Sequence, residues 1–252
     1  MRSPSDQSGS GTIGIVIVGH GERGGHADNQ VLLMLRERVA AETGVPAVDA
    51  GVLNGEPTLN QALGALAQRG VSQILLYPFF MSDGYFVRTA LPERIARSGV
   101  TLPWRILPPL GLDPAMPALI VARAIAEAYA AEWVPLLTRL LIVGHGSSKS
   151  RASAEATELV ADAVRNSGEF HLVETAFLEE PPFIAERISG DQRHTVVVGF
   201  FSAEGLHARD DIPAALAGTH ARYTGPIGAD PAIAGIAASA IMDAIRLEKS
   251  SS

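Results

Sequence analysis

The sequence contains no cysteine, which excludes disulfide bonds and thiolate metal sites. Any metal ion would therefore be held by nitrogen and oxygen donors. The chain also lacks an uninterrupted apolar run of the ~20 residues that a transmembrane helix needs, so no membrane segment is expected. It has no cluster of basic residues and a net charge of −7, which argues against a nucleic-acid partner. These absences predict a cytoplasmic protein that acts on small molecules.

Residues 1–11 are polar and rich in serine and glycine, and they are expected to form a disordered tail rather than a signal peptide. Hydrophobic residues make up 47% of the 252-residue chain, enough for a substantial core. Apolar runs that predict strands alternate with segments that predict helices, a pattern typical of parallel βαβ units. The expected strands cover residues 13–18, 45–53, 73–77, 104–107, 140–143, 170–177, 195–198 and 222–224. The expected helices cover residues 28–42, 57–70, 89–97, a long segment ending at 129, 152–166, a short segment ending at 188, and segments beginning near 210 and after 231.

The second half of the chain repeats the first. The order of motifs is the same in both halves, and the spacing shrinks only between elements, as trimmed loops would produce. The paired motifs are GHG at 19–21 and 144–146, LNGEP at 53–57 and LEEPP at 178–182, PFFMSDGYF at 78–86 and GFFSAEGLH at 199–207, and PLGLDP at 109–114 and PIGADP at 226–231. The sequence therefore predicts a duplication.

The two copies are expected to be tandem α/β domains, each a four-stranded parallel sheet flanked by helices. We predict an N-terminal repeat at 12–134 and a C-terminal repeat at 135–248. The connection is expected between residues 131 and 138, where Pro135 would break the preceding helix.

Three polar side chains of the second half follow the carboxyl ends of successive predicted strands: His145, Glu179 and His207. Loops at that edge of a parallel sheet converge on one crevice, so these side chains could meet. Two imidazoles and one carboxylate suit a divalent first-row ion and leave coordination positions open. An imidazole can also accept a proton at neutral pH. Asp210 or Asp211 is expected to cap the helix that follows.

In the first half the aligned residues are His20, Asn54 and Phe86, so two of the three donors are missing. A phenyl ring can neither bind a metal ion nor carry a proton. A single metal site would therefore belong to the second half, and the first half would be a retained scaffold.

Structural interpretations compete with these roles. His20 and His145 could each hydrogen-bond a turn, and His207 could be an exposed loop residue. Glu179 could complement the positive end of a helix, in which case Glu180 could be the metal ligand instead.

The motifs GHGS at 144–147, FLEEPP at 177–182 and GLHARDDIP at 205–213 resemble those of the class II tetrapyrrole chelatases of the CbiX/SirB type. The resemblance extends over residues 13–247 and fits the longer members built from two fused copies. It implies two tandem chelatase-like (flavodoxin-like) domains. The sequence departs from the family pattern at Ser148, where an arginine is usual, and at Gly199, where a proline is usual.

The resemblance implies that the protein inserts Co²⁺ or Fe²⁺, as a substrate, into a sirohydrochlorin-type tetrapyrrole of cobalamin or siroheme biosynthesis, without an organic cofactor. His145 and His207 would bind the metal and accept pyrrole protons, with Glu179 as their acidic partner. Four residues are candidates for contact with the macrocycle: His20, Phe200, Phe201 and Arg209. The two phenylalanines could equally belong to the core.

Two other functions compete with metal insertion. A non-catalytic carrier of metal or tetrapyrrole would explain the donors lost from the first half. A hydrolytic or phosphate-binding protein is least favoured, because the sequence contains neither a Walker motif nor a G-x-S-x-G elbow. The identity of the metal and the oligomeric state stay open at this point.

Overall fold

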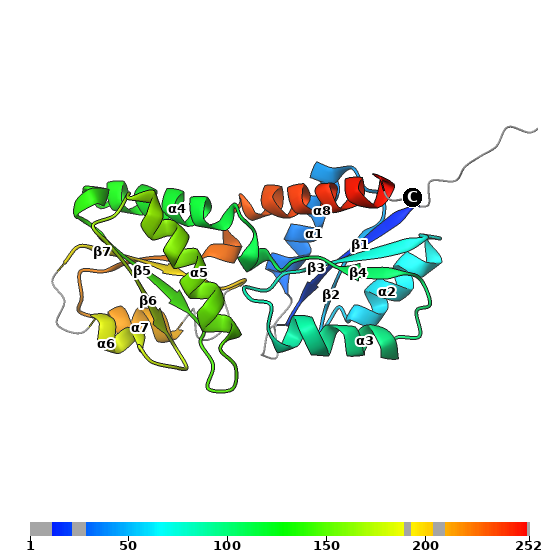
Figure 1. The fold of residues 1–252 in the computed structure, drawn as a ribbon, viewed down its shortest axis with the longest axis horizontal. Coiled ribbons are helices and arrows are strands. Elements are labelled where there is room, and N and C mark those ends of the chain that lie inside the picture. The colour runs from blue at the N-terminus through cyan, green and yellow to red at the C-terminus, as the bar shows by residue number, and fades with distance from the viewer. Residues whose placement is uncertain (1–11, 22–28, 189–192, 204–209, 251–252) are drawn as a thin grey trace, which may run out of the picture.

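The computed structural model describes residues 12–21, 29–188, 193–203 and 210–250. It contains two four-stranded parallel sheets, one from each half of the chain, as Figure 1 shows. The strand orders are β2-β1-β3-β4 and β6-β5-β7-β8, so the second sheet repeats the first. The strands are β1 Ile13–Gly19, β2 Val48–Val52, β3 Gln73–Pro78, β4 Trp104–Ile106, β5 Arg139–Gly144, β6 Leu172–Phe177, β7 Thr195–Gly199 and β8 Arg222–Pro226.

Helices cover both faces of each sheet, and the predicted fold of two tandem chelatase-like α/β domains is confirmed. The α-helices are α1 Gln30–Thr43, α2 Leu59–Gln68, α3 Leu91–Arg97, α4 Met116–Ala130, α5 Ala152–Ser167, α6 Ile184–Ile188, α7 Ile212–Leu216 and α8 Ile233–Ser250. A π-helical turn, η1 at Phe86–Ala90, leads directly into α3. Within the residues that the structure describes, no helix combines the length and apolar character needed to span a bilayer.

Of the two predicted caps of α7, Asp210 and Asp211, the structure excludes Asp211. Asp211 occupies the N-cap position, but its φ of −73° and ψ of −39° are already helical, and its side chain makes no capping hydrogen bond. A capping side chain normally projects from an extended residue. Thr58 provides such a cap at α2, with ψ of 150° and a reciprocal hydrogen-bond pair with Gln61.

The repeat extends to the packing of individual loops. In both halves, the first glycine of the motif after the fourth strand packs against a carbonyl of the loop after the third strand. A Cβ atom at Gly111 would lie 2.1 Å from the carbonyl oxygen of Met81, and one at Gly228 would lie 2.2 Å from that of Ser202. Only glycine fits these two contacts, which explains why both copies retain it.

The two halves exchange their last helices. Helix α4 ends the first repeat in sequence but packs on β7 and β8 of the second sheet, whereas α8 packs on α1 and β3 of the first half (Figure 1). The exchange joins the cores on this side of the sheets into one continuous apolar cluster, while the opposite faces keep separate clusters. The predicted boundary between residues 134 and 135 thus separates the two sequence repeats, but the packing of α4 and α8 crosses it.

Ion pairs hold both exchanged helices. Arg123 of α4 lies 2.6 Å from Asp230, which precedes α8, and also donates to the carbonyl oxygen of Thr224 at 2.6 Å. Arg105 of β4 lies 2.5 Å from Glu248 of α8. Each helix is therefore attached to the opposite half by charged groups as well as by apolar packing.

Ile241 tests the contribution of α8 to the stability of the fold. It is fully buried in that helix, so Ile241→Ala is expected to lower the free energy of unfolding by about 2–5 kcal/mol. Leu247 of the same helix is 61% exposed, and Leu247→Ala is expected to change it by less than about 0.5 kcal/mol. Urea unfolding of the two variants measures both values. Equal losses would contradict the packing of α8 described above.

Candidate functional site

The loop after β5 forms a tight turn that joins the first two candidate residues. The main-chain carbonyl of His145 accepts hydrogen bonds from the N–H groups of Leu178 at 3.2 Å and Glu179 at 2.9 Å. Gly146 has a φ of +73°, and a Cβ atom there would lie 2.9 Å from the side chain of Glu180. Glycine at this position therefore allows the loops after β5 and β6 to meet at the carboxyl edge of the sheet.

The imidazole of His145 is oriented by its own turn. Its Nδ1 lies 3.1 Å from the carbonyl oxygen of Gly146. A carbonyl can only accept, so Nδ1 is the donor in this hydrogen bond; in the neutral ring Nε2 would then carry the lone pair. The hydrogen bond that the turn interpretation expects is therefore present. It involves Nδ1 and not Nε2, so the turn interpretation does not exclude a ligand role for the ring.

The two neighbouring glutamates have different surroundings. A carboxylate oxygen of Glu179 lies 3.8 Å from Nδ1 of His145, and the two side chains are 48% and 44% exposed. Glu180 instead accepts a hydrogen bond of 2.9 Å from the main-chain N–H of Ser147. Glu180 therefore stabilises the turn, and Glu179 is the carboxylate that lies beside the imidazole.

The first half keeps the same turn with different side chains. Nδ1 of His20 lies 3.1 Å from the carbonyl oxygen of Gly21, and the main-chain carbonyl of His20 accepts from Asn54 at 3.0 Å. The edge of the His20 ring meets Phe86, with ring centroids 4.5 Å apart and an interplanar angle of 82°. The backbone frame is thus retained, while an amide and a phenyl ring occupy the positions that align in sequence with Glu179 and His207.

Two of the predicted residues, His207 and Arg209, lie outside the described residues. Among the residues that are described, no three metal-ligating side chains converge. The structure brings together His145 and Glu179, two of the three expected donors.

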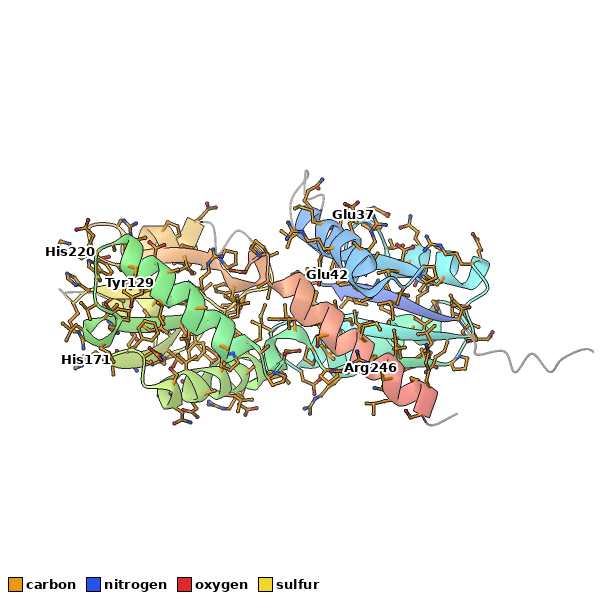
Figure 2. The ribbon with its side chains drawn as sticks, turned by 90° about the horizontal axis from the view of Figure 1, so that it is seen from above. Glu37, Glu42, Tyr129, His171, His220 and Arg246 are labelled. Carbon is orange, nitrogen blue, oxygen red and sulfur yellow. The ribbon has the colours of Figure 1, made fainter. Side chains whose placement is uncertain are left out.

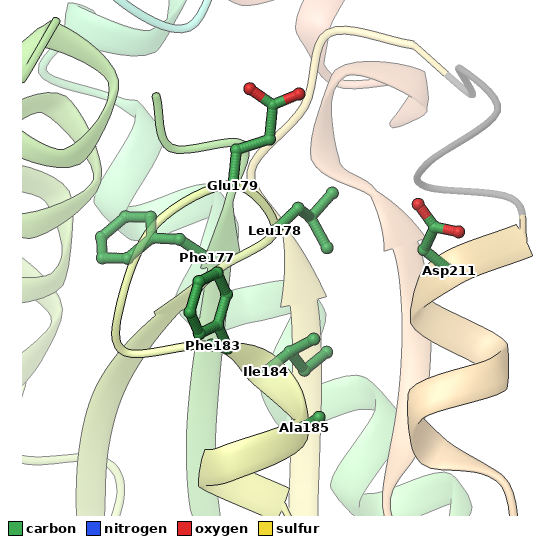
Figure 3. A pocket seen from close by; sticks show the side chains of 7 residues that line it. All are labelled: Phe177, Leu178, Glu179, Phe183, Ile184, Ala185 and Asp211. Carbon is green, nitrogen blue, oxygen red and sulfur yellow. The ribbon is translucent and has the colours of Figure 1, made fainter. Parts of the chain in front are cut away.

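A pocket of about 360 Å³ adjoins this pair, and Figure 3 shows it at close range. The carboxylates of Glu179 and Asp211 lie at one end, and apolar side chains line the rest. The lining residues are Phe177, Leu178, Glu179, Phe183, Ile184, Ala185 and Asp211. The pocket therefore has one acidic end next to the imidazole of His145 and one apolar end.

Phe200 and Phe201 are 2% and 9% exposed and belong to the apolar clusters on the two faces of the second sheet. Their counterparts Phe79 and Phe80 are equally buried. This burial favours the core interpretation over direct contact with a macrocycle.

Tyr77 of β3 has a buried hydroxyl that finds no hydrogen-bond partner among the described residues. Burial, assisted by the nearby carboxylate of Asp113, raises the pKa of this hydroxyl well above its usual value. It therefore stays protonated at neutral pH and does not act as a base. The aligned residue of the second half is Val198, so the hydroxyl is a feature of the first half alone.

Comparisons with known proteins agree with this architecture. The family model described as CbiX matches the chain twice, at residues 14–127 and 139–244. A probable sirohydrochlorin cobaltochelatase of Halobacterium salinarum is 24% identical, with 91% of each chain covered. A sirohydrochlorin cobaltochelatase of Methanosarcina barkeri is 26% identical, and 93% of it matches 44% of this chain.

Solved structures give the same result. A CbiX described as the terminal enzyme of siroheme biosynthesis in denitrifying bacteria is 33% identical, covers 92% of this chain and 99% of its own, and has a TM-score of 0.79. SirB from Bacillus subtilis with Fe³⁺ is 19% identical with a TM-score of 0.80, covering 95% and 98%, which shows a shared fold. The two matches of the family model and the two repeated sheets lead to one conclusion: the chain belongs to the CbiX family of chelatases, in its two-repeat form.

Proposed function

We propose that this protein inserts Co²⁺ or Fe²⁺ into a sirohydrochlorin-type tetrapyrrole. Family membership and the names of the relatives support the reaction class. The observation that carries the proposal for this chain is the His145 imidazole beside the Glu179 carboxylate, at the carboxyl edge of the second sheet. A nitrogen and an oxygen donor of this kind bind first-row divalent ions, and the site has no thiolate that would favour softer ones.

We propose His207 as the third donor. The support comes from the repeat: the residue aligned with it, Phe86, lies in contact with His20, the residue aligned with His145. If the second half follows the first, positions 145 and 207 are neighbours. A pair of imidazoles with one carboxylate would then hold the ion and leave coordination positions for the macrocycle nitrogens.

In the proposed reaction the metal ion passes from these side chains to the four ring nitrogens, and two pyrrole N–H protons leave. Nε2 of His145, which carries the lone pair, is positioned to accept one proton once the ion has left it. Glu179 would stabilise the resulting imidazolium, since an adjacent negative charge favours the protonated form. A positioned base with a pKa near ambient pH accelerates proton transfer by about 10²–10⁴-fold.

The two glutamates provide a matched test of the metal site. Glu179→Ala is expected to weaken Co²⁺ binding at least ~10-fold, as loss of a coordinating or adjacent carboxylate does. Glu180→Ala removes the acceptor for the Ser147 N–H and is expected to lower thermal stability more than metal affinity. Calorimetric Co²⁺ titration and thermal unfolding separate the two effects. A larger loss of Co²⁺ affinity in Glu180→Ala would make Glu180 the ligand.

Assays of the purified protein also distinguish a chelatase, which inserts the metal ion, from a carrier, which only binds the metal or the tetrapyrrole. A chelatase speeds the appearance of the metallated tetrapyrrole when sirohydrochlorin and Co²⁺ are mixed. A carrier, the alternative favoured by the donors missing from the first half, would bind Co²⁺ or the macrocycle stoichiometrically and leave the rate of metallation unchanged.

A further inference from the structure

The segment after β3, where it enters η1, exposes two large aromatic side chains. Tyr85 is 60% exposed and Phe86 is 38% exposed. Exposed aromatic side chains that adjoin one another often mark a binding surface in soluble proteins. We call these two residues the aromatic platform.

Neighbouring rings hold the aromatic platform in place. Phe80 lies below Phe86 in a stacked arrangement, with ring centroids 6.1 Å apart and an interplanar angle of 18°. The edge of His20 contacts Phe86 from another direction, and Tyr85 meets Phe86 at 5.6 Å and 69°. The ring of Phe86 is thus supported by three others, which fixes its orientation without covering it.

The aromatic platform lies next to the loop that carries the candidate metal site. A Cβ atom at Gly84 would lie 3.3 Å from the Cβ atom of Ala152, the first residue of α5. Helix α5 follows the turn of His145. In Figure 1 these two loops meet near the middle of the molecule, between the two sheets. The first half therefore contributes an apolar surface to the region in which the second half contributes metal donors.

The region also contains cationic groups. Arg88, which follows the aromatic platform in η1, is 71% exposed and lies 2.9 Å from Asp83. Lys149 and Arg151 are exposed in the loop that leads from His145 to α5. Arg151 also lies 3.9 Å from Glu155. Apolar rings in a region that also carries cations suit a ligand with an apolar conjugated centre and peripheral carboxylates.

We propose that Tyr85 and Phe86 form an apolar contact surface for the tetrapyrrole, so that the half without metal donors positions the macrocycle for the half that has them. The proposal rests on the chelatase function given above and adds residues that position the substrate. It also explains why Phe86 stands where the other half has a histidine: a ring that binds no metal leaves a single ion site and provides apolar contact area instead.

The test compares Tyr85→Ala/Phe86→Ala with Tyr129→Ala in the full chain. Tyr129 is a 66% exposed tyrosine on α4, far from the middle of the molecule in Figure 2, so it controls for the loss of an exposed ring. Metal-free sirohydrochlorin is titrated and followed by its absorbance, and Co²⁺ binding is measured separately by calorimetry. We expect the double variant to raise the Kd for the macrocycle at least ~10-fold, the size expected from losing two aromatic contacts. The Kd for Co²⁺ should stay unchanged, and Tyr129→Ala should change neither.

Two further variants keep the result interpretable. Tyr85→Phe retains the ring and is expected to bind the macrocycle like the wild type. Tyr85→Ala removes only the more exposed ring and replaces the double variant if thermal unfolding shows that the latter is unstable. An unchanged Kd for the macrocycle, in a folded variant of a wild type that inserts metal, would overturn the aromatic platform alone. A wild type that binds the macrocycle without inserting metal would overturn the chelatase function, while the change in Kd would still decide on the aromatic platform.

Discussion

Replacing His145 by alanine is expected to lower the rate of metal insertion at least ~10²-fold, because the variant loses a metal donor and a proton acceptor in one step. The hydrogen bond from Nδ1 to the Gly146 carbonyl holds the imidazole in the turn, and alanine removes the whole ring. The measurement is the spectral change of sirohydrochlorin on mixing with Co²⁺ or Fe²⁺. His207→Ala is expected to cause a loss of similar size.

His20→Ala is the matched comparison, since His20 makes the same turn with the same Nδ1 hydrogen bond in the first half. Its loss removes an edge contact with Phe86 but no proposed metal donor. We therefore expect a much smaller fall in rate than for His145→Ala. Equal losses from the two variants would mean that the working site has been assigned to the wrong half.

The second large effect is a gain of metal binding in the first half. Asn54→Glu/Phe86→His restores the missing carboxylate and imidazole at positions aligned with Glu179 and His207. The frame is already present, because Asn54 donates its N–H to His20 as Glu179 does to His145. The ring at position 86 already lies against His20. We expect calorimetric titration to show one Co²⁺ ion per chain for the wild type and two for this variant.

A His145→Ala background makes this experiment decisive. There the second site is disabled, and adding Asn54→Glu/Phe86→His is expected to restore one bound Co²⁺. Phe86→His alone supplies two imidazoles without a carboxylate and should bind more weakly. No restored binding in a folded triple variant would show that the first half has lost more than its donors. Phe86→His also removes one ring of the aromatic platform, so binding of the macrocycle should weaken as Co²⁺ binding appears.

Much of the fold follows from local sequence patterns. The apolar runs at 195–198 and 140–143 lie within β7 and β5, and the alternation of strands with helices fixes a parallel sheet. The repeated motifs identify which loops correspond, and the corresponding loops adopt the same turns at His20 and His145. These features depend on interactions between residues close in sequence or between adjacent strands, which is why sequence reasoning reaches them.

The exchange of α4 and α8 is not encoded in a local pattern. Each helix presents an apolar face, and the two sheets offer similar surfaces, so periodicity cannot say which sheet a helix covers. The same limit applies to Phe200: an aromatic residue directly after a strand could point into the core or into a crevice, and only the packing decides. The choice between Glu179 and Glu180 likewise depends on which carboxylate reaches the Ser147 N–H.

The exchanged helices also determine how far the two halves can move apart. Two domains joined by a single connecting segment can swing about it, but here each half reaches across and is fastened to the other by an ion pair, Arg123 with Asp230 and Arg105 with Glu248. Two such crossings, one from each half, oppose both separation and rotation of the two halves relative to each other. The two halves are therefore expected to keep one relative orientation with or without a ligand.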